Sequence, residues 1–149
     1  MALLILLAIH PVAARERLRA LLEREQFEVI EAPADGPEVA RLTGARRPDI
    51  VVLSSSSSLA GTAAAAAIHD AQPQTPVILL IPAAIEAEIG AALAVGIRGC
   101  ALDTDPAEGV VRAVYDVSRG GAYLSPAVLR VLFEPYLPAA TPPNGATGS

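Results

Sequence analysis

Short apolar runs alternate with longer stretches of helical pattern five times along this chain. The runs are rich in Val, Ile and Leu without polar alternation, which is typical of strands buried on both faces of a parallel sheet. They predict strands at Leu3–Ala8, Phe27–Ala32, Ile50–Leu53, Val77–Ile81 and Gly99–Leu102. Strands that alternate strictly with helices across short links predict a five-stranded, doubly wound parallel α/β sheet with helices on both faces.

Proline, glycine and capping residues predict where the helices begin and end. Proline at a first helical position predicts that the first helix starts at His10-Pro11. Asp105 as N-cap, Pro106 at the first helical position and Glu108 as a capping-box acid predict the start of the fifth. The others are expected from after the turn Pro33–Pro37 to about Gly44, at Thr62–Ala71, from about Ala84 to Val95, and from Ser125-Pro126 through Phe133.

These patterns divide the chain into three parts. Residues 1–124 form the main domain, residues 125–137 add a C-terminal helix, and residues 138–149 form a linker or tail rich in Pro and Gly. The apolar start MALLILLAI lacks basic residues and is too short to cross a bilayer, so we expect a buried first strand and a cytoplasmic protein.

Composition excludes several kinds of chemistry. The net charge of −5 gives this chain no electrostatic footprint for nucleic acid. Its single cysteine, Cys100, excludes an internal disulfide and a cysteine-based metal cluster. All 11 basic residues are arginines, so neither a Schiff-base lysine nor a P-loop lysine exists.

The carboxyl ends of the predicted strands are where open α/β sheets bind ligands. Here the third strand opens into the serine run Ser54–Ser58, and the neighbouring strands end in Ala8-Ile9 and Ile81-Pro82. Hydroxyl groups without carboxylates predict no metal, no cofactor and no acid–base pair, hence no enzyme. Because Ile9 and Ile81 are large and apolar, we expect them to pack towards each other and close this edge.

Several ordered motifs over about residues 3–134 carry a family resemblance. They are LLAIHPVAARERLRALLE, ADGPEVARL, RRPDIVVL, TPVILL, AVGIRGCAL and RGGAYLSPAV. The chain resembles the receiver domains of bacterial two-component response regulators, of the NarL/FixJ type with a LuxR-type helix-turn-helix output domain. This resemblance implies a CheY-like, flavodoxin-like fold and a role in the regulation of transcription.

The residues that this family uses for phosphotransfer are replaced at the matching positions. Ala8 and Ile9 stand where the resemblance implies an acidic pair, Ser54 in place of the phospho-accepting aspartate, Ile81 in place of a hydroxyl residue, Asp103 in place of a lysine, and Cys100 in place of the aromatic switch residue. The resemblance therefore implies an atypical receiver that works without phosphorylation.

Two functions from different classes remain open. One is a transcriptional regulator that forms a homodimer and reaches DNA only through an output domain absent from this chain. The alternative is a sensor that binds a small molecule in the former phosphorylation pocket. Two surfaces compete for the dimer contact: the fourth helix–fifth strand–fifth helix face, and the first and fifth helices extended by the sixth. On the first face, Glu86 and Glu88 of one copy are expected to oppose Arg98, Arg112 and Arg119 of its partner across the two-fold axis. On the second, the sixth helix carries Leu129, Leu132 and Phe133.

Overall fold

The fold is built on a single parallel sheet with the strand order β2-β1-β3-β4-β5-β6. The computed structural model describes residues 2–138, and only the backbone of residues 58 and 59. The strands are β1 (Leu4–Ala8), β2 (Glu28–Glu31), β3 (Ile50–Ser54), β4 (Val77–Ile81), β5 (Gly99–Leu102) and β6 (Tyr123–Leu124). The predicted doubly wound α/β architecture is confirmed, with one strand more than the five expected.

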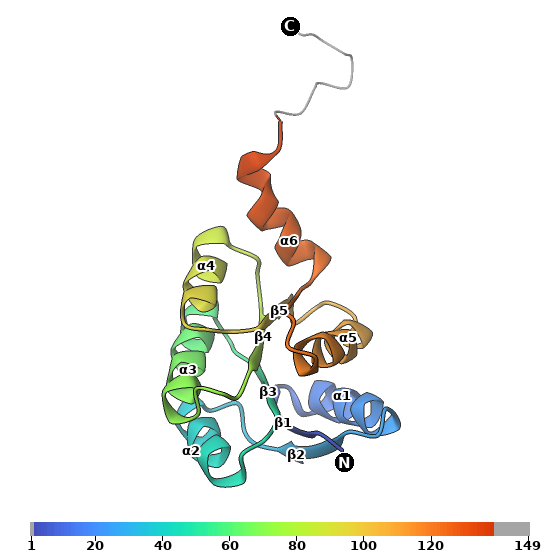
Figure 1. The fold of residues 1–149 in the computed structure, drawn as a ribbon. Coiled ribbons are helices and arrows are strands. Elements are labelled where there is room, and N and C mark those ends of the chain that lie inside the picture. The colour runs from blue at the N-terminus through green and yellow to red at the C-terminus, as the bar shows by residue number, and fades with distance from the viewer. Residues whose placement is uncertain (1, 139–149) are drawn as a thin grey trace, which may run out of the picture.

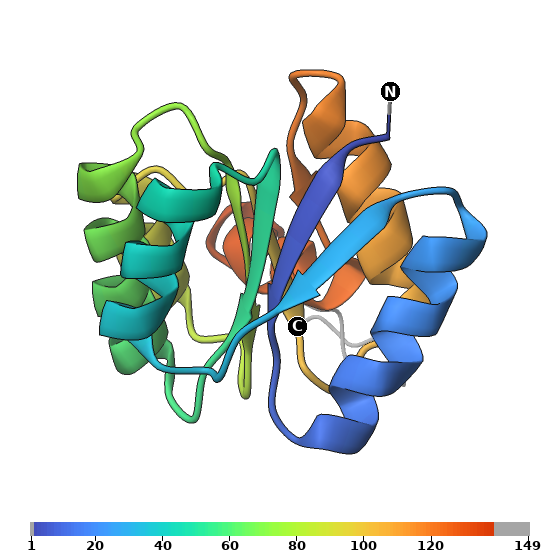
Figure 2. The same cartoon turned by 90° about the horizontal axis from the view of Figure 1, so that it is seen from below.

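Helices cover both faces of this sheet (Figures 1 and 2). They are α1 (Val12–Arg24), α2 (Gly36–Arg46), α3 (Ser58–Ala71), α4 (Glu86–Ala94), α5 (Ala107–Ser118) and α6 (Pro126–Phe133), and a 3₁₀ turn, η1 (Glu134–Tyr136), follows α6. Helices α1 and α5 lie on one face, whereas α2, α3 and α4 lie on the other. None of the helices in residues 2–138 has the length and apolarity that crossing a membrane requires.

Two apolar cores form because successive strand side chains point to opposite faces. In β1, Leu6 and Ala8 pack towards α2 and α3, whereas Ile5 and Leu7 pack towards α1 and α5. Every residue of β3 and β4 is buried, as expected for central strands covered on both sides.

Two predicted helix starts are wrong by one position. Pro11 and Pro106 are the N-cap residues of α1 and α5, not their first helical residues. Asp105 does not cap α5, because its Oδ2 accepts a hydrogen bond from the backbone N–H of Leu102 at 2.8 Å instead. The carboxylate thus closes the turn after β5, and α5 begins without a side-chain cap.

The strand that the sequence did not predict, β6, joins the free edge of β5. Tyr123 pairs with Gly99 and Leu124 with Cys100. Ser125 then caps α6 by accepting from the N–H of Val128, as predicted, and Val128 is fully buried in the core on the α3–α4 side. The helix after residue 124 is therefore anchored to the sheet. Of the predicted tail, residues 139–149 lie outside the described residues.

Candidate functional site

The predicted site residues meet at the carboxyl edge of the sheet. Ala8 ends β1 and Ile9 follows it, Ser54 ends β3, Ile81 ends β4, and Asp103 follows β5. The register places β1 and β4 on either side of β3, and the Asp103 N–H donates to the Ile81 carbonyl at 2.9 Å. All five positions therefore belong to neighbouring strand ends, as expected for a parallel sheet.

Ser54 is the buried polar group at the centre of this edge. Its exposed fraction is 5%, and its Oγ accepts a hydrogen bond from the backbone N–H of His10 at 2.9 Å. The hydroxyl therefore ties the end of β3 to the loop between β1 and α1. Because a hydroxyl also donates, the Ser54 proton can still reach a ligand placed at this edge.

The edge is open rather than closed. Two hollows, of about 590 and 480 Å³, meet around His10, Ser54 and Asp103. The larger one lies between the start of α1 and the start of α5 and has Ile9, Leu80 and Val110 among its apolar lining residues and Arg17 among its polar ones.

The expected contact between Ile9 and Ile81 is wrong. Both side chains are buried, at 4% and 1% exposure, but they belong to different cores. Ile9 faces the α1–α5 side and Ile81 the α2–α3–α4 side, so the sheet itself lies between them. Side-chain alternation along the two strands decides this outcome.

The polar side chains of this edge include the Ser54 hydroxyl, the Asp103 and Asp105 carboxylates, and the His10 and Arg17 side chains that line the larger hollow. Asp103 is exposed, and Asp105 is half-buried and engaged with Leu102. Among residues 2–138, no three His, Cys, Asp or Glu side chains gather in a way that could hold a metal ion. The arrangement places hydrogen-bonding and charged side chains beside an apolar wall.

Comparisons with known proteins agree with this geometry. No family model matches the chain. The transcriptional regulatory protein DegU of Brevibacillus brevis is 27% identical over 124 residues, which cover 82% of this chain and 52% of that protein. The chain thus spans about half the length of this curated relative.

Solved structures extend the likeness to three dimensions. A LuxR-family two-component response regulator from Aurantimonas sp. SI85-9A1 superimposes with a TM-score of 0.80 at 24% identity, covering 91% of this chain and 99% of that one. The signal receiver domain of the putative response regulator NarL from Mycobacterium tuberculosis gives 0.68 at 25% identity, covering 80% and 98%.

The chain has a receiver fold and is similar to the receiver domains of response regulators. The CheY-like fold expected from the sequence is confirmed by these structures and by the strand order. Within this fold, the larger hollow at the carboxyl edge lies between the start of α1 and the loop that joins β5 to α5.

Cys100 lies in β5 with its side chain fully buried. Burial first, and the Asp105 carboxylate second, raise the pKa of the thiol to about 12. The backbone carbonyl of Cys100 accepts from the Ser125 N–H at 3.0 Å, and the side chain shares a core with Val128 of α6. The Cys100 thiol is therefore protonated near neutral pH and is buried in the core on which α6 packs.

The five charged residues predicted for a dimer face are distributed over α4, the segment before β5, α5 and the residue after it. Glu86 and Glu88 lie in the first turn of α4, which starts at the carboxyl edge, whereas Arg98 precedes β5 at the opposite edge. Arg112 pairs with Asp116 within α5 at 3.7 Å, and Arg119 lies over the Tyr115 ring at 5.6 Å. Between them, β6 and α6 cover the outer side of β5.

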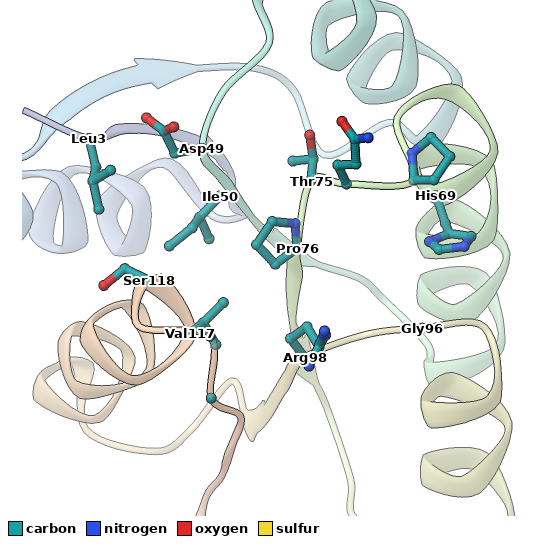
Figure 3. Close-up of a pocket in the computed structure, with 14 residues that line it drawn as sticks. Leu3, Asp49, Ile50, His69, Thr75, Pro76, Gly96, Arg98, Val117 and Ser118 are labelled. Carbon is teal, nitrogen blue, oxygen red and sulfur yellow. The ribbon is translucent and has the colours of Figure 1, made fainter.

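A further hollow of about 660 Å³, at the amino edge of the sheet, was missed by the sequence analysis. Figure 3 shows it, with Asp49 on one side and His69 of α3 on the other. Oδ2 of Asp49 accepts from the Leu4 N–H at 2.7 Å, so this carboxylate aligns the start of β1 with that of β3. The Pro48-Asp49 pair before a strand was the only sequence signal for this arrangement.

Proposed function

We propose that this receiver domain regulates transcription as a homodimer whose formation does not depend on phosphorylation. The observation that carries the proposal is the carboxyl edge, where Ala8, Ile9 and Ser54 replace every acid expected at β1 and β3. A Mg²⁺ ion in a phosphotransfer site usually uses one or two carboxylates together with phosphate oxygens. Asp103 stands where the resemblance implies a lysine, and its negative charge would repel a phosphoryl group.

DNA would be reached through an output domain outside this chain. The receiver itself carries a net charge of −5, which gives it no electrostatic attraction for the phosphate backbone. Dimerisation supplies what such a regulator needs, because two output domains held by a two-fold axis match the two halves of a palindromic site.

Sedimentation equilibrium at micromolar concentration tests this proposal. We expect a dimer of the same strength with and without Mg²⁺ and beryllofluoride, an analogue of the phosphoryl group. A dimer that forms only with beryllofluoride would contradict phosphorylation independence, and a monomer under both conditions would contradict the dimer mechanism. Arg112→Glu, at an exposed side chain, tests the α4–β5–α5 face: loss of the dimer would place the contact there.

One observation favours a second candidate, a small-molecule sensor. The hollow of about 590 Å³ beside Ser54 is within the size range of ligand pockets and combines an apolar wall with His10, Arg17 and Asp103. A ligand-dependent rise in melting temperature, lost in an Ala14→Trp variant that fills the mouth of this hollow, would establish the sensor. No rise with any member of a metabolite library would leave the dimeric regulator as the better account.

A further inference from the structure

Helix α6 leaves the domain with an apolar face that nothing in the described chain covers. Figure 1 shows α6 running away from the sheet beyond β5 and α4. Val128 is fully buried, but Leu129 and Phe133 are 37% and 56% exposed. The 3₁₀ turn that follows adds Tyr136, and Leu137 comes directly after it, at 83% and 56% exposure.

Leu129 and Phe133 form one stripe, because residues four apart lie above each other on a helix. Val128 anchors a different side of α6 to the core, so the stripe is not needed for docking on the sheet. Large apolar side chains gathered on an outward face are typical of a contact with another protein.

The charges beside this stripe indicate what kind of protein would make this contact. Arg130 and Glu134 each follow a stripe residue by one position, so both lie on the same flank of the helix. Both are exposed, and neither takes part in any ion pair found within residues 2–138. Opposite charges four residues apart on one flank are complementary to the same flank of an identical helix running in the opposite direction.

We propose that a second copy of this chain packs its α6 antiparallel against this α6 around a two-fold axis. An axis that crosses the helix level with Leu132, midway between the two charges, places Arg130 of each copy opposite Glu134 of the other. Leu129 and Phe133 of both copies then fill the centre, as the isologous geometry of a two-fold contact requires. This inference rests on the proposed dimer and names the surface that forms it.

The size of the contact sets its expected strength. Specific interfaces bury roughly 1,200–2,000 Å² in total, more than a pair of eight-residue helices supplies. We therefore expect Tyr136 and Leu137, which are exposed beside the stripe, to extend the contact, and we expect the dimer to be of moderate strength.

Charge reversal in the full 149-residue chain tests this geometry. Sedimentation equilibrium should show that Arg130→Glu and Glu134→Arg each weaken the dimer, because each places two like-charged pairs across the axis. The double variant Arg130→Glu with Glu134→Arg restores both attractive pairs and should return the dimer to wild-type strength. Phe133→Asp should raise Kd by about tenfold or more, since it removes a central apolar anchor.

Matched controls separate this surface from the others. Arg112→Glu reverses an exposed charge on α5 and should leave the dimer unchanged, and circular dichroism checks that each variant is folded. A dimer that survives Phe133→Asp, or a double variant no stronger than the singles, would overturn the α6 contact while leaving the proposed dimeric regulator intact. A wild-type chain that stays monomeric would overturn both.

Discussion

Ser54 accepts the His10 N–H at the centre of the pocket, and this contact determines what an aspartate at the same place would do. We expect Ser54→Asp to lower the free energy of unfolding by about 1–3 kcal/mol, because a carboxylate replaces a buried hydroxyl near Asp103. Acetyl phosphate with Mg²⁺ should add no phosphoryl mass to the variant, since the other acids and the lysine are still missing.

Chemical denaturation and intact-protein mass spectrometry measure both effects. Ser54→Asn is the control, because it keeps a polar side chain of similar size without the charge and should lose less stability. A phosphoryl adduct on the aspartate would show that the rest of the pocket is competent and would contradict phosphorylation independence.

Ile81 is 1% exposed at the end of β4 and packs only on the α2–α3–α4 side. Ile81→Thr should lower the free energy of unfolding by about 1–2 kcal/mol, through lost apolar burial and a hydroxyl placed in an apolar core. Ile85→Thr, at a side chain 46% exposed, should change it by less than about 0.5 kcal/mol. Equal losses in the two variants would contradict the burial of Ile81.

The Cys100 thiol makes stability depend on pH in alkaline solution. Its pKa of about 12 in the folded chain exceeds the ordinary value of 9.0, so the folded state holds the proton more tightly than the unfolded state does. Below about pH 9 the thiol is protonated in both states and does not change the free energy of unfolding. Above about pH 9 the unfolded state loses the proton first, so the free energy of unfolding falls by up to about 1.4 kcal/mol per pH unit. Chemical denaturation at pH 8 and pH 10 should show that the free energy of unfolding falls less in Cys100→Ala than in the wild-type chain. An identical fall in the two would contradict the shifted pKa.

At the scale of the element, the serine run shows how a polar cluster becomes part of a helix. Ser57 is the N-cap of α3, and its side chain accepts from the Ala60 N–H at 3.1 Å, so α3 begins four residues before the predicted Thr62. Ser57→Ala should cost about 1 kcal/mol of stability. Ser56→Ala, at an exposed serine without such a bond, should be neutral within about 0.5 kcal/mol, and thermal denaturation compares the two.

The strands were predictable and several helix starts were not, for a physical reason. An uninterrupted apolar run such as Ile50–Leu53 indicates a strand buried on both faces of the sheet, and this pattern can be read from the run itself. A cap depends on which partner a side chain reaches: the Asp105 carboxylate accepts from the Leu102 N–H, and α5 begins without a side-chain cap. Strand β6, only two residues long, leaves no periodic signal at all.

The sequence was sufficient to predict which residues lie at the carboxyl edge of the sheet, but not how their side chains are oriented there. Parallel topology alone brings Ser54 and Asp103 to one edge. The side of the sheet that Ile9 and Ile81 each face depends on the strand register, and the hollow beside Asp49 is assembled from segments far apart in the sequence. Neither follows from local pattern.

At the scale of the whole molecule, the addition of β6 and α6 changes which surface is free. In a five-stranded version of this fold β5 would be an open edge, but here Tyr123 and Leu124 pair with it and α6 packs beside α4. Sheet edges with unpaired N–H and C=O groups invite further strands, so this arrangement directs association away from the edge and towards helical surfaces.

Because Cys100 is buried in the core on which α6 packs, the reactivity of its thiol can be used to measure local opening of the structure around α6. No other thiol exists in the chain, and a buried thiol reacts with a disulfide reagent only when the structure around it opens. The labelling rate near neutral pH therefore measures how often α6 lifts from the sheet. If α6 undocks on its own, Ser125→Ala should speed labelling more than it lowers global stability. If α6 leaves only when the whole domain unfolds, the two changes will match, and the helix is an integral part of the fold.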